Sequence, residues 1–105
     1  MTAAIKKMWE VEATDEGFDV STPEAIRSAE HVFANCKLEG LTKAEIDSLL
    51  SVSSRSAKYG YRAPFYPPPQ DSEVFRFDNG RFGVQYDVVF DRSGKCSKVI
   101  KRGIE

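Results

Sequence analysis

The sequence predicts an α+β domain in which two short helices pack on an antiparallel sheet of three to four strands. Three observations lead to this prediction. Residues 21–51 contain two stretches with helical signals, residues 57–102 contain aromatic segments of alternating polarity, and an Asn-Gly pair joins two of those segments. Apolar residues spaced by three and four are typical of helices, whereas strict alternation is typical of strands. A chain of 105 residues has the size of a single domain.

The first predicted helix begins at Thr22-Pro23. A residue before proline is disfavoured in helical conformation and suits the N-cap, and proline suits the first helical position. We expect the helix to run to about Lys37, because apolar residues then recur at Ile26, Ala29, Phe33 and Cys36. The preceding residues 1–20 form an arm that reads either as a short helix or as a strand-like cover of the core. Trp9 is the expected packing anchor of this arm.

The second predicted helix is short and has a complete start signal. Thr42 and Glu45 stand at the two positions of a capping box, in which each side chain accepts a backbone N–H of the first turn. Leu41 and Ile46 stand at the positions of a hydrophobic staple. A helix of about ten residues is not stable alone in water. We therefore expect its apolar face to lie on the sheet.

The C-terminal half predicts an antiparallel meander. The expected strands are 57–63, 73–78, 81–90 and about 95–102, with a proline-rich loop at 64–69. Asn79-Gly80 is a strong hairpin signal, and a type I′ turn would place Asp78 opposite Arg81 and Phe77 opposite Phe82. The residues expected to face the core are Phe82, Val84, Tyr86, Val88 and Phe90. The sequence leaves open whether Lys95 or Cys96 pairs with Phe90.

Composition excludes several classes of protein. No apolar run approaches the roughly 20 residues that span a bilayer, and residues 1–12 lack the apolar core of a secretion signal, so we expect a cytoplasmic protein and no membrane partner. Cys36 and Cys96 belong to no metal-binding motif and are interpreted as reduced, half-buried thiols. The single histidine, His31, has no second ligand nearby and is interpreted as a solvated or capped side chain. We expect no metal and no cofactor.

The charge is unevenly distributed. Residues 1–52 carry five basic and ten acidic side chains, whereas residues 53–105 carry ten basic and six acidic ones, and the net charge is −1. The simplest interpretation is an acidic helical layer against a basic sheet. Nucleic-acid contact through the sheet is an alternative, but the chain has no overall basic excess, so nucleic acid is not the expected partner.

Two motifs resemble a known family. The pattern Gly40-x-Thr42-x-x-Glu45-Ile46-x-x-Leu49-Leu50, followed by Val89-Phe90-Asp91-x-x-Gly94-Lys95, is similar to the SmpA/OmlA-like and beta-lactamase-inhibitor-protein-like group. The resemblance spans about Thr22 to Ile100, and it implies two small helices packed against an antiparallel sheet. The family usually has Gly and Pro after the Leu-Leu pair, where this sequence has Ser51-Val52-Ser53. We carry over the fold only, because function does not follow from fold.

The sequence favours a non-enzymatic protein–protein interaction module. It has no Cys-His or Ser-His-Asp spacing and no Gly-rich phosphate loop, so we expect no catalytic residues. The candidate protein-contact residues are Tyr61, Arg62, Phe65, Tyr66, Pro67, Pro68 and Pro69. Tyr, Phe and Arg dominate interface hot spots, although the same rings could instead fill the core. We expect an unknown protein partner, a monomer or weak homodimer, and an inhibitor or immunity-type role as an alternative.

Overall fold

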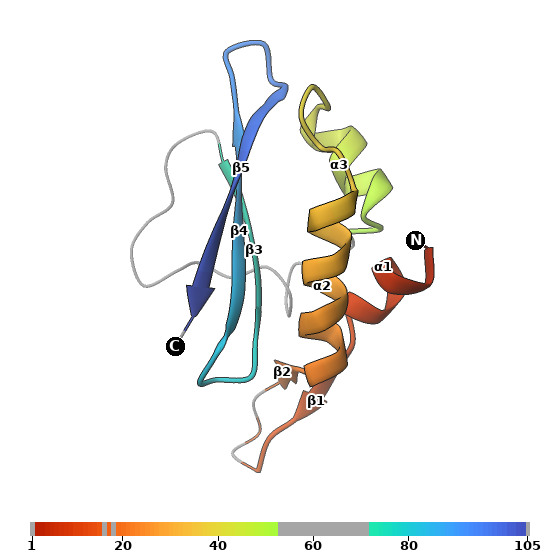
Figure 1. Ribbon diagram of the computed structural model, residues 1–105, viewed down its shortest axis with the longest axis vertical. Coiled ribbons are helices and arrows are strands. Elements are labelled where there is room, and N and C mark those ends of the chain that lie inside the picture. The colour runs from red at the N-terminus through yellow and green to blue at the C-terminus, as the bar shows by residue number, and fades with distance from the viewer. Residues whose placement is uncertain (1, 16, 18, 53–71, 105) are drawn as a thin grey trace.

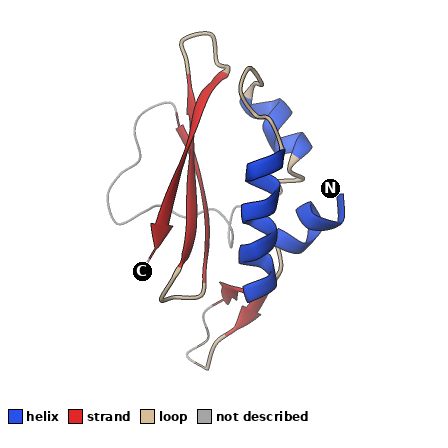
Figure 2. Ribbon diagram, in the orientation of Figure 1, coloured by secondary structure: helices blue, strands red, loops and turns tan. Residues whose placement is uncertain are grey.

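The computed structural model describes residues 2–15, 17, 19–52 and 72–104. Within them the chain forms three helices, a two-stranded ribbon and a three-stranded antiparallel sheet (Figures 1 and 2). The elements in chain order are α1 (Thr2–Met8), β1 (Val11–Ala13), β2 (Asp19–Ser21), α2 (Pro23–Asn35), α3 (Lys43–Leu49), β3 (Ser72–Asp78), β4 (Gly83–Phe90) and β5 (Cys96–Ile104). The predicted α+β class is therefore confirmed. The prediction of two helices is wrong, because the arm contains a third.

The helices lie together on one side of the sheet, whose strand order is β3-β4-β5 (Figure 1). β1 and β2 pair with each other at the base of α2 rather than joining the sheet. α1 is short but buries Ile5 and Met8, and this burial explains why the arm is helical there. Tertiary contact stabilises such a short helix, which its local sequence could not do alone. The predicted strand at 57–63 lies outside the described residues.

Both helix-start predictions are confirmed. The Thr22 hydroxyl accepts the Ala25 N–H at 3.0 Å, with Pro23 as the first helical residue. At the start of α3, the Thr42 hydroxyl accepts the Glu45 N–H at 3.2 Å, and the Glu45 carboxylate accepts the Thr42 N–H at 2.9 Å. The hydrogen bond from the Thr42 backbone, and then the one from its side chain, lower the pKa of Glu45. Ile46 from this helix is fully buried in the core.

The core lies between the helices and one face of the sheet. Trp9 packs against Phe77 with ring centroids 5.3 Å apart and against Phe75 at 6.1 Å. Its indole N–H donates to the Leu50 carbonyl at 2.7 Å and so ties the arm to the end of α3. Phe75 and Phe77 are fully buried. The prediction that Trp9 anchors the arm is confirmed by these contacts.

The register of the Asn-Gly hairpin differs from the prediction. Asp78 pairs with Gly83 and Phe77 with Val84, so the loop contains four residues and not two. The side-chain oxygen of Asn79 accepts the N–H groups of Arg81 and Phe82, each at 3.0 Å, and these hydrogen bonds stabilise the longer loop. Phe82 is consequently 59% exposed and is not a core residue.

The remaining core-face predictions hold, and the last hairpin is now fixed. Val84, Tyr86 and Val88 are buried, and Phe90 packs partly buried against the same cluster. Phe90 pairs with Cys96, with a bulge between Val89 and Phe90. The register question that the sequence left open is settled in favour of Cys96. The Cys96 N–H donates to the Leu41 carbonyl at 2.7 Å, which joins β5 to the linker before α3.

Candidate functional site

All seven predicted contact residues lie outside the described residues. Tyr61, Arg62, Phe65, Tyr66, Pro67, Pro68 and Pro69 fall in the 53–71 segment. Their role as a protein-contact loop therefore stays a prediction. The described part of the chain offers a different candidate site.

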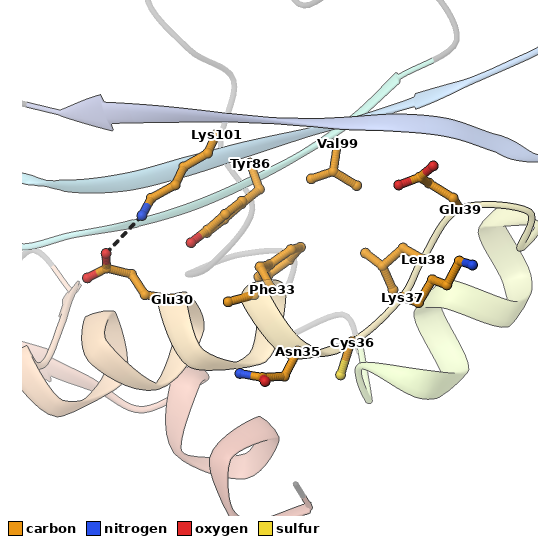
Figure 3. Close-up of a pocket in the computed structure, with 11 residues that line it drawn as sticks. Glu30, Phe33, Asn35, Cys36, Lys37, Leu38, Glu39, Tyr86, Val99 and Lys101 are labelled. Carbon is orange, nitrogen blue, oxygen red and sulfur yellow. Dashed lines mark hydrogen bonds and ion pairs between the residues drawn. The ribbon is translucent and has the colours of Figure 1, made fainter.

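This candidate is a groove between α2 and the β5 side of the sheet, with a volume of about 490 Å³ (Figure 3). The α2–β5 groove, as we call it, combines the C-terminal half of α2, the linker to α3, and residues of β4 and β5. Its apolar part is formed by Phe33, Leu38, Tyr86 and Val99. Its charged residues are Glu30, Lys37, Glu39 and Lys101. An apolar centre with a polar rim is the usual anatomy of a protein-binding surface.

The apolar part of the groove combines residues from the apolar stripe of α2 and from the alternating pattern of β4. Phe33 belongs to the stripe of α2 that also buries Ala29 and Val32. Tyr86 projects from the helix-facing side of β4, where alternate residues share a face. The two rings stack with centroids 4.0 Å apart and planes at 7°. This stacked ring pair therefore joins α2 to β4.

An ion pair closes one end of the groove. The Lys101 ammonium on β5 lies 3.0 Å from a Glu30 carboxylate oxygen on α2 (Figure 3). Both side chains are about half exposed, at 56% and 46%, and such pairs contribute at most about 1 kcal/mol. An incoming ligand could therefore separate them at little cost.

The Tyr86 hydroxyl stays protonated across the physiological range. Burial, and then the nearby Glu30 carboxylate, raise the pKa of Tyr86 to about 12. In Figure 3 its oxygen points toward the Glu30–Lys101 end of the groove. The groove therefore holds a hydrogen-bond donor beside an apolar surface. This combination suits a ligand with both apolar and carbonyl or carboxylate groups.

The cysteines are free thiols in different settings. Cys36 lines the groove and is half-buried, whereas Cys96 is buried on β5. Burial raises the pKa of the Cys96 thiol, which makes it less reactive. His31 is exposed, and the side-chain amide of Asn35 lies 3.3 Å from its Nδ1. Among the residues that the structure describes, no three or more His, Cys, Asp or Glu side chains are grouped to hold a metal ion.

The basic residues of the sheet divide between its two faces. The β4–β5 register places Lys101 opposite Tyr86, on the helix-facing side, and Lys98 opposite Val89, on the other side. Arg76 lies 3.6 Å from Asp78, and Arg102 donates to Asp87 at 2.7 Å. The described basic side chains therefore do not form one positive face. Lys58 and Arg62 lie outside the described residues.

The sequence contained a weak signal for the groove. Phe33 and Tyr86 were both predicted to face the core, but their contact joins elements far apart in the chain. No local pattern shows that linker residues 36–39 leave a hollow beside this contact. The edge position of β5 likewise depends on strand order, which is a tertiary property.

The fold and the groove together define a small α+β domain with an open surface groove. Comparisons with protein-family models, with curated proteins and with solved structures gave no match to this chain. The resemblance to the SmpA/OmlA-like and beta-lactamase-inhibitor-protein-like group therefore stays a prediction. None of the helices in the described ranges is long and apolar enough to cross a membrane.

Proposed function

We propose that this protein is a non-enzymatic protein-interaction domain that uses the α2–β5 groove as a contact surface. The observation that carries the proposal is the position of the groove. A groove of about 490 Å³ with an apolar centre opens directly beside β5, the last strand of the sheet in the described part of the chain. Extended peptides commonly bind by adding a strand to such an edge and placing alternate side chains in neighbouring pockets.

The partner that fits this surface is an extended segment with acidic side chains along β5, where Lys101 and Arg102 already pair with Glu30 and Asp87 within the chain. Residues 95–102 contain four basic side chains and no acidic one. A second copy of the chain, pairing β5 with β5, would bring these like charges together, and opposed like charges destabilise a sheet. Acidic side chains in the partner would instead complement them, while its apolar side chains contact Phe33 and Val99. We accordingly expect a monomer or weak homodimer when no partner is bound.

The predicted loop at 61–69 is a separate proposal for the same class of function. Tyr61, Arg62, Phe65 and Tyr66 are of residue types that dominate hot spots, and the three prolines reduce the entropy that a loop loses on binding. An inhibitor or immunity-type protein would use either surface. We expect the protein to act in the cytoplasm and without a cofactor.

The groove is tested by a substitution that fills it without changing the core. Ala34 is exposed on α2 and lines the groove, so Ala34→Arg should block partner binding while preserving the helix. Ala44→Arg is the matched control, because Ala44 is an exposed alanine on α3 that does not line the groove. Each tagged chain is used for affinity capture from the native cell, followed by quantification of the recovered partners.

The expected result is a partner that the wild-type and A44R chains recover equally and that the A34R chain loses by at least about tenfold. A third chain, with Phe65→Ala and Tyr66→Ala, separates the two surfaces. If A34R recovers the same partner as wild type, the groove is not the contact surface. Loss only in the F65A/Y66A chain would assign the contact to the loop instead.

A further inference from the structure

Two acidic side chains meet one lysine where α3 lies against the sheet. The Lys43 ammonium is 2.9 Å from Oδ2 of Asp47, one turn later in α3, and 3.2 Å from Oε2 of Glu73 on β3. The Glu73 side chain is only 7% exposed, and that of Asp47 is 27% exposed. The arrangement joins a helix and a strand that are far apart in the chain, and none of its three side chains lines the groove.

The second oxygen of each carboxyl group lacks a partner. Oδ1 of Asp47 and Oε1 of Glu73 are both buried, and neither accepts a hydrogen bond. An ionised carboxylate only accepts hydrogen bonds, whereas a protonated carboxyl also donates one. The two side chains lie within hydrogen-bonding reach of each other, so a proton on one carboxyl group could be donated to the other. Buried polar atoms in native structures are nearly always paired in some such way.

Electrostatics favour the same proton. With both carboxyl groups ionised, the three side chains would carry a net charge of −1, and the Glu73 carboxylate would hold its charge with a side chain only 7% exposed. The charged groups that face Glu73 in the described chain are Lys43 and Asp47, both from α3, and its register partner on β4 is the apolar Val88. Burial, and then the hydrogen bond and charge of Asp47, raise the pKa of Glu73 to about 7, although Lys43 opposes this change. The hydrogen bond from Lys43 to Asp47 raises the pKa of Lys43, and this side chain stays positively charged.

We propose that Asp47 and Glu73 share one proton and that this proton, together with Lys43, holds α3 against β3. We call these three side chains the clasp. When solvent removes the proton, two carboxylates face each other around a single ammonium, and α3 is held less firmly. α3 has seven residues and depends on such contacts for its stability. The linker before it carries Leu38 and Glu39 of the groove, so loosening of α3 would also change the groove wall. The clasp does not depend on the proposed function.

The clasp is tested first by ¹³C NMR titration of the side-chain carboxyl carbons in the wild-type chain. The expected result is that the Glu73 signal titrates with a midpoint near 7. In the Asp47→Asn chain the Glu73 midpoint should fall toward its ordinary value of 4.5. A wild-type Glu73 midpoint near 4.5 would overturn the proposal. So would a raised midpoint that Asp47→Asn leaves unchanged, since burial alone would then explain it.

Hydrogen exchange of the α3 amides gives the second readout. After correction for intrinsic exchange, the equilibrium constant for opening of α3 should increase with pH between about 5 and 7, by up to about tenfold for each pH unit. The reason is that Glu73 keeps its proton to a higher pH in the closed state than in the open state. In the Glu73→Gln chain, whose amide cannot ionise, this dependence should be absent. Equal pH dependence in the two chains would show that Glu73 does not control α3.

Discussion

Replacing Trp9 by phenylalanine tests how the arm is attached to the core. The indole N–H donates to the Leu50 carbonyl at 2.7 Å, and phenylalanine has no donor. Leaving a buried carbonyl without its partner costs about 1–3 kcal/mol, and this contact is partly buried, so the lower half of that range applies. The smaller ring also loses contact with Phe75 and Phe77, which adds about 1 kcal/mol. We expect the free energy of unfolding to fall by about 2 kcal/mol in total.

The assay is thermal and urea unfolding followed by circular dichroism, because the variant loses the only tryptophan of the chain. A loss of 2 kcal/mol should lower the Tm by about 8 to 16 °C in a domain of this size. Phe82→Ala is the control, since that ring is 59% exposed, and its effect should stay within about 0.5 kcal/mol. If Trp9→Phe is as mild as the control, the arm is not attached to α3 in the way described.

Three further predictions concern stability. Thr42→Ala removes one arm of the capping box and should lower the free energy of unfolding by about 1 kcal/mol in urea titration; no measurable loss would contradict the cap. Gly83→Ala should cost about 3 kcal/mol or more in the same assay, because a Cβ there would overlap the Phe77 carbonyl oxygen. A Cβ at Gly103 meets nothing within 4 Å, so Gly103→Ala should be nearly neutral. Because the folded-state pKa of Glu73 is raised from 4.5 to about 7, its protonation stabilises the fold fully below pH 4.5, and this contribution is lost as the pH rises toward 7. Urea titrations across this range should show a loss of up to about 3 kcal/mol in wild type that Glu73→Gln does not show.

The features that the sequence predicted correctly are those set by local contacts. The Thr42 capping box and the Thr22-Pro23 start depend on hydrogen bonds and dihedral angles within four residues. The alternation along β4 placed Val84, Tyr86 and Val88 on one face of the strand, and this face lies in the core. Short-range physical chemistry was sufficient for each of these predictions.

The incorrect predictions have identifiable physical causes. Asn79-Gly80 predicted a two-residue turn, but the Asn79 side chain holds a four-residue loop and moves Phe82 into solvent. Phe77 pairs with Val84 and not with Phe82 as predicted. In this register Gly83, which has no Cβ, allows the strands to approach closely. The sequence left the arm open between helix and strand, since tertiary burial of Met8 and not local propensity makes it helical.

The candidate groove and the acid pair depend wholly on tertiary structure. Glu73 was predicted only as the start of a strand, and nothing in its neighbourhood along the chain shows that Lys43 and Asp47 lie against it. The same holds for the stack of Phe33 on Tyr86, which joins a helix to a strand. Such sites follow from which elements pack together, and sequence spacing alone does not contain that information.

Hydrogen-exchange footprinting of the protein with and without its captured partner tests the central claim most directly. The partner recovered with the wild-type chain is added back to the purified protein, and amide protection is compared across all residues. The groove model predicts new protection in β5 (Cys96–Ile104) and in the C-terminal half of α2, with little change in β3. Protection confined to residues 61–69, with β5 and α2 unchanged, would contradict it.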